Sequence, residues 1–349
     1  MKKLCIYAAS DRFNYGDLLF PLILSEMLKP ATDKVFQIEV VGTVKSDLRV
    51  AGGLKTTPVK NLFSTALFPP GSVVIVGGGE VLPPSWHEVM GCTDSRLSTI
   101  AQLCESALMK VRFPAWRWTM LTDRIFRWLV CPKLEYPFLL SEGHFPLGIR
   151  VIYNTIGCIG LENLGDNAAI FRERLNGATF LSVRDKASAD ALRKLGFHSE
   201  RVRLAPDSAI VISDLYDRRL ILNSCEKPIQ AFINAHEYRY VCFQISLQHA
   251  KDNISALALQ LNQIAKTHDA RILLLPIGYA RHHWDQHALA RIREALTVES
   301  VMPEAPSVMN IMAAIAFCKV FIGTSLHGAI TALSYAVPHV SIGPSGGKL

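Results

Sequence analysis

The chain has 349 residues, of which half are hydrophobic and about a fifth are charged. Lysine and arginine number 37 against 30 aspartate and glutamate, so the formal net charge is +7 with histidine neutral. This composition excludes a disordered chain, a collagen-like chain and a small disulfide scaffold. The length predicts two domains, and a chain of this size can bury a core without the support of disulfide bonds or metal ions.

The N-terminal part alternates short apolar runs with helical patterns. Residues 4–9 predict a first strand, because this run is too short for a signal peptide although Met1-Lys2-Lys3 precedes it. Leucines at helical spacing between Leu18 and Leu28 predict a helix after it. The next predicted elements are strands at 73–76, 151–156 and 179–183, and a helix that ends at Gly196.

A second series of the same kind starts near Val241. It predicts strands at 241–245, 271–275, 320–323 and 340–342, with helices over 254–264, 289–296, 308–316 and from Gly328. Fully apolar strands that alternate with helices are typical of parallel sheets with helices on both faces. The sequence therefore predicts an α/β protein with two such sheets, joined within residues 213–236, and domains 1–222 and 223–349.

Several classes of protein and site are disfavoured. The longest apolar run, residues 311–318, ends at Lys319, well short of the roughly 18–20 residues of a membrane-spanning helix. The eight cysteines include no C-x-x-C pair, which favours free thiols in a reduced, cytoplasmic setting and argues against a zinc site. Neither G-x-G-x-x-G nor G-K-[ST] occurs at the glycine loop, and the basic residues form no stripe that would bind nucleic acid. No metal and no cofactor are expected.

Residues 110–133 depart from this pattern. They hold six basic residues, one acid (Asp123) and five aromatic residues, among them Trp116 and Trp128. This composition is typical of a helix that lies on an anionic membrane, here at its inner face. It is equally typical of a helix that packs on a neighbouring domain, and the sequence leaves both interpretations open.

In open parallel sheets, ligands bind beyond the carboxyl ends of the strands. Polar residues follow predicted strands at four places, namely Asn14-Tyr15-Gly16-Asp17, Gly77-Gly78-Gly79-Glu80, Ser182-Val183-Arg184-Asp185 with Pro206-Asp207, and Thr324-Ser325-Leu326-His327.

Each of the first three places has a structural and a functional interpretation. Gly16 suits a tight turn and Asp17 a helix cap, but Asp17 also suits a sugar hydroxyl or its proton. The glycines 77–79 form a tight turn or admit a ligand close to the backbone. Arg184 grips a carboxylate or phosphate, or forms an ion pair with Asp185 or Asp207.

The fourth place is the most specific. The turn before Gly328 sets His327 beside amide groups at a helix N-terminus, and such amides bind anions. Thr324 or Ser325 is expected to cap that helix. A single histidine at a helix start is usually structural, but one beside an anion site at a sheet edge is a functional candidate.

Taken in order, these motifs resemble the polysaccharide pyruvyl transferase family. That family shows an N-x-G-D turn, a G-G-G loop, S-x-R-D with a following serine (here Ser188), P-D, and a final R-L-H-G or S-x-H-G turn. The likeness extends from residue 1 to about residue 345. It implies two Rossmann-like domains with parallel sheets in a glycosyltransferase-B-like fold, with the acceptor on the N-terminal side and the donor on the C-terminal side.

The resemblance also implies a reaction. Phosphoenolpyruvate would be the donor, and a sugar of a cell-surface glycan or its lipid-linked oligosaccharide precursor the acceptor, with a pyruvate ketal as product. His327 would be the general acid or a phosphate ligand, and Asp17 and Asp207 the candidate bases. The implied substrate-binding residues are Arg184, Ser325, Leu326, Gly328, Asn14, Gly78, Gly79 and Arg281.

This chain departs from the family pattern in one residue of the last motif. Ser325 stands where many members have an arginine that the resemblance assigns to the donor; Arg184, Arg281 and Lys348 are candidates to replace it. Members commonly continue past the position of Leu349, so a shortened or differently closed chain is expected. The alternatives are a nucleotide-sugar glycosyltransferase of similar fold and a non-catalytic glycan-binding relative, which Ser325 favours.

Overall fold

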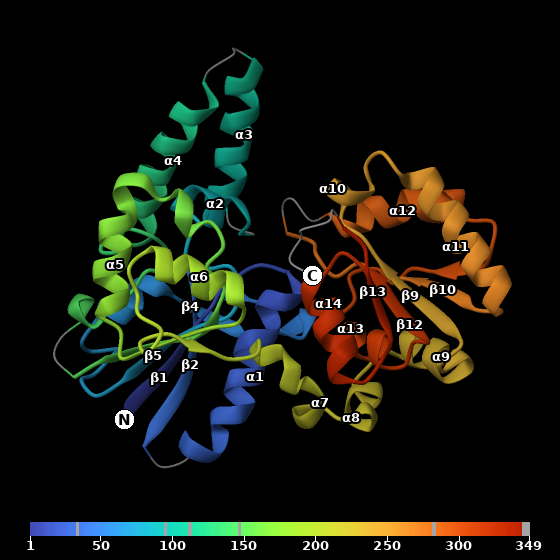
Figure 1. Ribbon diagram of the computed structural model, residues 1–349, viewed down its shortest axis with the longest axis horizontal. Helices are drawn as coiled ribbons and strands as arrows, with labels where there is room; N and C mark the ends of the chain where they lie inside the picture. The colour runs from blue at the N-terminus through green and yellow to red at the C-terminus, as the bar shows by residue number, and fades with distance from the viewer. Residues whose placement is uncertain (33–34, 94–95, 111–113, 146–147, 281–283, 344–349) are drawn as a thin grey trace. The chain divides into compact units, whose positions relative to one another are not determined.

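The computed structural model describes residues 1–32, 35–93, 96–110, 114–145, 148–280 and 284–343. The chain forms two compact units (Figure 1). The first unit comprises Met1–Arg12, Phe20–Leu48 and Leu54–Ser208, and the second comprises Phe13–Leu19, Arg49–Gly53 and the chain from Ala209 onward. The functional assignment of domains 1–222 and 223–349 stays a prediction.

The first unit is built on a sheet with the strand order β3-β4-β2-β1-β5-β6-β7-β8, parallel except for the short β3. Its strands are β1 (Lys2–Tyr7), β2 (Phe36–Gly42), β3 (Ser46–Asp47), β4 (Lys55–Pro58), β5 (Val73–Gly77), β6 (Arg150–Ile156), β7 (Phe180–Val183) and β8 (Arg203–Leu204). Its helices are α1 (Tyr15–Thr32), whose first residues belong to the second unit, α2 (Trp86–Gly91), α3 (Arg96–Lys110), α4 (Ala115–Val130), α5 (Ala168–Asn176) and α6 (Lys186–Lys194).

Alternate residues of the central strands enter two different cores, because successive side chains of a strand point to opposite faces. Leu4, Ile6 and Ile75 pack with Leu24 of α1. Their neighbours in β1 and β5 pack in a larger cluster to which α2, α4, α5 and α6 contribute. Burial on both faces explains why these strands are continuous apolar runs.

The second unit has a fully parallel sheet with the order β11-β10-β9-β12-β13. Its strands are β9 (Tyr240–Gln244), β10 (Arg271–Leu274), β11 (Ser300–Val301), β12 (Val320–Gly323) and β13 (His339–Ser341). Its helices are α7 (Ile212–Leu215), α8 (Arg218–Asn223), α9 (Lys227–His236), α10 (Leu247–Ala250), α11 (Ile254–His268), α12 (Asp285–Ala295), α13 (Val308–Ala316) and α14 (Leu326–Ser334).

The chain order reverses between β1 and β5 in the first sheet and between β9 and β12 in the second. In parallel sheets of this kind, ligands bind at the carboxyl ends of the strands beside the reversal. Those ends are followed by the glycine loop after β5 and by the turn before α14.

The predicted α/β class is confirmed, as are the predicted strands β1, β5, β6, β7, β9, β10, β12 and β13 within a few residues. Helix α13 spans the predicted residues 308–316, whereas α14 begins at Leu326, two residues before the predicted Gly328. The strands β2 and β4 and the separate helices α3 and α4 were not predicted.

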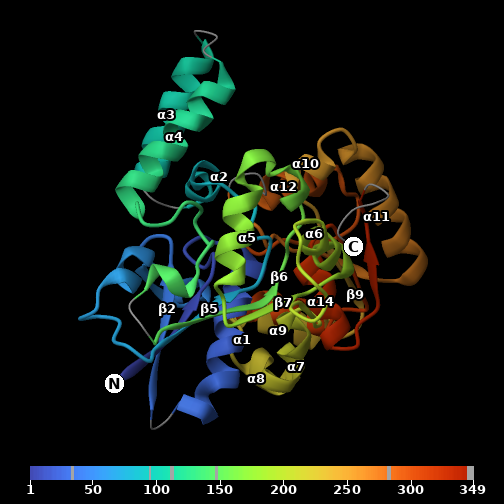
Figure 2. The same ribbon diagram turned by 60° about the vertical axis from the view of Figure 1, so that its left-hand side comes forward.

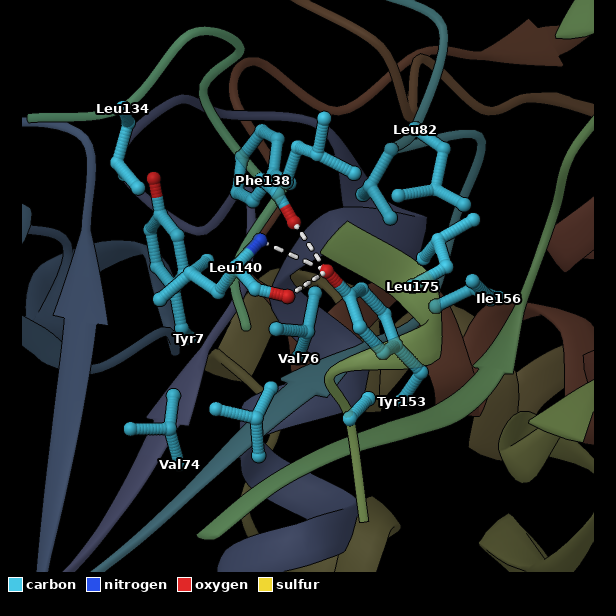
Figure 3. Close-up of a cluster of buried hydrophobic side chains, with 14 of the residues drawn as sticks. Tyr7, Val74, Val76, Leu82, Leu134, Phe138, Leu140, Tyr153, Ile156 and Leu175 are labelled. Carbon is cyan, nitrogen blue, oxygen red and sulfur yellow. Dashed lines mark hydrogen bonds between the residues drawn. The ribbon is translucent and has the colours of Figure 1, made fainter. Parts of the chain in front are cut away.

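A buried tyrosine holds the loop that precedes β6 (Figure 3). The Tyr153 hydroxyl accepts a hydrogen bond from the Leu140 amide at 2.7 Å and lies 2.8 Å from the Leu140 carbonyl. Its pKa is raised because burial disfavours the phenolate, so it stays a neutral donor and acceptor. The loop crosses the core only because these backbone groups are satisfied.

We therefore expect Tyr153→Phe to destabilise the first unit by about 1–3 kcal/mol, because the buried Leu140 amide loses its partner. Urea unfolding and hydrogen exchange at Leu140 measure the effect. Tyr238→Phe is the matched control, because Tyr238 is exposed and its substitution should change stability by less than about 0.5 kcal/mol. Equal stability of the two variants would contradict this role of Tyr153.

Candidate functional site

The turn before α14 is fixed by one buried glutamine. The Gln244 side-chain oxygen, at the end of β9, accepts hydrogen bonds from the backbone amides of Thr324 at 3.0 Å and Ser325 at 2.9 Å. Ser325 is the N-cap of α14, since its hydroxyl accepts from the Gly328 amide at 3.2 Å. Of the two predicted caps, Ser325 is thus the one that the structure uses.

A buried aspartate anchors that glutamine. The Gln244 side-chain nitrogen donates to Asp285 Oδ2 at 2.9 Å, and the same oxygen accepts from the amides of Ile277 and Gly278. The carboxylate thus ties the loop after β10 to the turn before α14. Sequence analysis missed both Gln244 and Asp285, because neither belongs to a local motif.

The N-x-G-D turn lies in the same unit and contacts that loop. Asn14 forms an antiparallel bridge with Gly278, and the Tyr15 amide donates to the Ile277 carbonyl at 3.1 Å. The Tyr15 hydroxyl shares a 2.9 Å hydrogen bond with Thr331 of α14. Burial raises the pKa of Tyr15, so this hydroxyl is neutral.

The predicted roles of Gly16 and Asp17 in a tight turn and a cap are wrong. Helix α1 begins at Tyr15, so both residues lie in its first turn. Asp17 Oδ2 accepts a hydrogen bond from the Asn14 side chain at 3.0 Å, and its charge is favourable near the helix N-terminus.

Gly16 instead makes room for His327. A Cβ atom at position 16 would lie 2.1 Å from His327 Nδ1 and 2.6 Å from Cγ, so the imidazole packs directly against the helix backbone. Within α14, the backbone carbonyl of His327 accepts a hydrogen bond from the Thr331 hydroxyl at 2.7 Å. The structure thus joins the first and last motifs, because Gly16 lies against His327 and Tyr15 bonds Thr331.

A cavity of about 320 Å³ opens beside this turn. Ile245, Leu257 and Ile342 supply apolar walls, and Thr324, His249 and Asn253 supply polar groups. An apolar pocket with a few polar groups is the usual form of a small-molecule site. His249 and Asn253 were not singled out from the sequence; their position just after β9 is the signal that was available.

Arg184 belongs to a different cluster, in the first unit. Its guanidinium donates to Glu80 Oε1 at 2.7 Å and Asp207 Oδ2 at 3.1 Å, and Nε lies 3.7 Å from Asp185 Oδ2. The side chain is 5% exposed. Burial alone would lower the pKa of Arg184, and the Asp207 and Glu80 carboxylates outweigh it, so the pKa is raised. We call these four residues the Arg184 cluster; its three carboxylates outnumber its one cation.

The other residues of the S-x-R-D motif hold the backbone. Asp185 is the N-cap of α6 and accepts from the Ser188 amide at 2.6 Å, while the Ser188 hydroxyl accepts from the Cys158 amide. Ser182 accepts from the amide of Thr155, a β-branched residue with φ of +47° at an irregularity in β6. Such strain persists only where its surroundings enforce it.

The glycine loop after β5 has a packing role. Gly78 has φ of +67°, and a Cβ there would lie 2.0 Å from Phe20 Cγ, so no other residue fits. Gly79 also has positive φ, and its carbonyl accepts from the Gly157 amide at 2.7 Å. Substrate contacts of Gly78 and Gly79 stay a prediction.

Two further candidate residues lie outside the described part of the chain. Arg281 and Lys348, two of the candidates to replace the family arginine, fall outside the described residues. In the part of the chain that is described, no group of three or more His, Cys, Asp or Glu residues could hold a metal ion.

The fold defines the class of the protein: an α/β protein with two Rossmann-like domains of the glycosyltransferase-B-like type. Similar solved structures are the UDP-GlcNAc 2-epimerase of Methanocaldococcus jannaschii (TM-score 0.54, 10% identity, 98% of this chain and 83% of that chain) and that of Neisseria meningitidis bound to UDP-GlcNAc (0.51, 13%, 98% and 82%). At these identities the likeness concerns the fold alone.

Sequence comparison is more specific about the family. The family model of the polysaccharide pyruvyl transferases matches residues 14–346, so the chain belongs to this family of transferases. No curated protein matches the chain in sequence.

The contact between Gly16 and His327 predicts that the effect of Gly16→Ala on stability changes sign when His327 is removed. Gly16→Ala should destabilise the protein by about 1–3 kcal/mol, because the new methyl group displaces the imidazole. In a His327→Ala background the same change should stabilise by up to about 1 kcal/mol, because alanine is the better helix former. Denaturant unfolding of the four proteins of this cycle measures both effects. An equal effect of Gly16→Ala in both backgrounds would contradict the contact.

Arg184→Ala should destabilise the first unit by about 3–5 kcal/mol, because it leaves buried carboxylates without their cation. Denaturant unfolding of the variant and the wild type tests this expectation. The control replaces Arg184 by Met together with Glu80→Gln and Asp207→Asn, which removes the charges jointly and should recover most of the stability.

Proposed function

We propose that the protein transfers the pyruvyl group of phosphoenolpyruvate to a sugar and closes it into a ketal across two hydroxyls. The acceptor is a sugar of a cell-surface polysaccharide or of its lipid-linked precursor. Family membership supports pyruvyl transfer in general. The observation that carries the finer proposal is the packing of His327, at the start of α14, against Gly16, the neighbour of Asp17 in the chain.

The donor suits the second unit. Phosphoenolpyruvate carries a phosphate and a carboxylate, and α14 presents its N-terminus, where helix amides point outward along the axis, next to the Ser325 cap. Helix amides and the helix dipole favour an anion there. Ser325 and Thr324 add hydroxyl groups, and the adjoining cavity of about 320 Å³ offers apolar walls to the three-carbon unit.

The chemistry needs one acid and one base. A proton added to C3 of phosphoenolpyruvate makes C2 electrophilic, and a sugar hydroxyl attacks C2 and releases its proton. The bond from C2 to the phosphate oxygen then breaks, and the second hydroxyl closes the ketal and releases another proton. One released proton replaces the one consumed at C3 and the other leaves with phosphate, so the step balances. His327 is the proposed acid or phosphate ligand, and Asp17 the proposed base.

The acceptor suits the first unit. The Arg184 cluster carries an excess of carboxylate, which favours hydroxyl donors over a second anion. Asn154 and Thr155 contact the Ser208 hydroxyl at 2.8 Å each, beside Asp207 in the sequence. We therefore assign Arg184 to positioning carboxylates such as Asp207, the second candidate base, for a sugar.

A nucleotide-sugar glycosyltransferase is the alternative that one observation favours. The similar epimerase of Neisseria meningitidis was solved with UDP-GlcNAc bound. A thermal-shift panel separates the two proposals, since a ligand stabilises by RT ln(1 + [L]/Kd). A shift with UDP-sugars and none with phosphoenolpyruvate would favour the alternative. A shift with acceptor glycan alone would favour the non-catalytic relative.

For the transfer itself, His327→Ala should lower phosphate release from phosphoenolpyruvate, with acceptor glycan present, by about 10²–10⁴-fold. The assay measures inorganic phosphate and the ketal product. His268→Ala is the control, because His268 is an exposed histidine at the end of α11. Undiminished turnover in His327→Ala would reject the assignment of this site.

A further inference from the structure

The helices α3 and α4 form a hairpin that extends from the first unit, as both views show (Figures 1 and 2). The base of the hairpin packs against α2, and the His87 amide donates to Asp123 of α4 at 3.1 Å. Asp123, the one acid of α4, is therefore turned toward the first unit.

Helix α4 has one buried face and one exposed face. Its buried residues, Thr122, Phe126 and Val130, recur at intervals of four. Beside that face runs a stripe of exposed apolar residues, Leu121, Ile125, Trp128 and Leu129. Residues at this spacing share one side of a helix, so the stripe is continuous.

The exposure is unusual for a surface helix. Trp128 is 73% exposed and Trp116 61% exposed, and on α3 Leu103 is 67% exposed. Eight exposed large apolar residues belong to the described part of the hairpin: Ile100, Leu103, Trp116, Met120, Leu121, Ile125, Trp128 and Leu129. Contiguous exposed apolar surface of this kind marks a surface that is covered in use.

A basic row lies beside the apolar stripe. Arg117 and Arg124 are exposed and one heptad apart, so they share a face of α4, and Arg117 lies 5.1 Å from the ring centroid of Trp116. Aromatic and aliphatic side chains next to arginines are the composition that lies at the boundary of headgroups and acyl chains. The positive row complements an anionic headgroup layer.

We propose that the α3–α4 hairpin docks the protein on the surface of an anionic lipid membrane, with α4 lying along the interface. Leu121, Ile125, Trp128 and Leu129 enter the acyl boundary, and Arg117 and Arg124 contact phosphate headgroups. Among the described residues, no helix is long and apolar enough to cross a membrane. Docking brings the first unit to a lipid-linked acceptor; this consequence rests on the proposed function, whereas the docking itself does not.

The test uses the full chain and two kinds of vesicle, phosphatidylcholine alone and phosphatidylcholine mixed with phosphatidylglycerol. We expect co-flotation with the mixed vesicles, a blue shift of tryptophan emission, and little binding to the neutral ones. Arg117→Gln with Arg124→Gln should weaken binding by about 25-fold, fivefold for each basic residue. Trp116→Ala with Trp128→Ala should abolish the blue shift and most of the binding.

Matched controls keep the result specific. Arg219→Gln with Lys251→Gln removes the same charge from exposed sites outside the hairpin, and Leu259→Ala removes an exposed leucine of α11; both should bind like wild type. His327→Ala should also bind normally, which separates docking from transfer. Equal binding to both vesicles, unchanged binding of the hairpin variants, or self-association in sedimentation velocity that the tryptophan variant abolishes would overturn the proposal.

Discussion

The second unit depends on the close approach of an imidazole ring to a helix backbone. His327 stands against Gly16 at a distance that no side chain at position 16 would permit. The approach is possible because the start of α1 bridges the loop after β10, and because Tyr15 and Thr331 bond the first turns of α1 and α14. A ring confined in this way has little rotamer freedom to lose on binding a ligand, which favours a precise position for its nitrogen atoms.

The chain has two polar centres that differ in the charge they favour. In the second unit, the side-chain oxygens of Gln244 and Asp285 accept hydrogen bonds from backbone amides and fix the loops around α14. The N-terminus of α14 is the place in this unit where an anion is favoured. In the first unit, Glu80, Asp185 and Asp207 surround Arg184, and carboxylate is in excess. This division matches the different charges of the two proposed substrates, an anionic donor and a neutral sugar.

Most of the strands, though not β2 and β4, were predictable because they depend on local patterns. Apolar runs such as 73–76 are required by burial on both sheet faces, and glycines and prolines mark their ends. The contact of Gly16 with His327 was not predictable, because it depends on how distant segments meet and Gly16 by itself suggests a turn. Gln244 and Asp285 were not identified from the sequence for the same reason. In residues 110–133 the composition was informative, but only the structure separates the side occupied by Phe126 from the side that carries Trp128.

The serine at the N-cap of α14 has a consequence for introducing the arginine that the resemblance leads us to expect at this position. Arginine at position 325 would add a guanidinium but has no oxygen to accept the Gly328 amide, at a cost of about 0.5–2 kcal/mol. The amide at position 325 would still reach Gln244, so the loop would keep its path while the helix end frayed. A gain in charge and a loss of local order are thus coupled at a single residue, and the substitution Ser325→Arg exchanges one for the other.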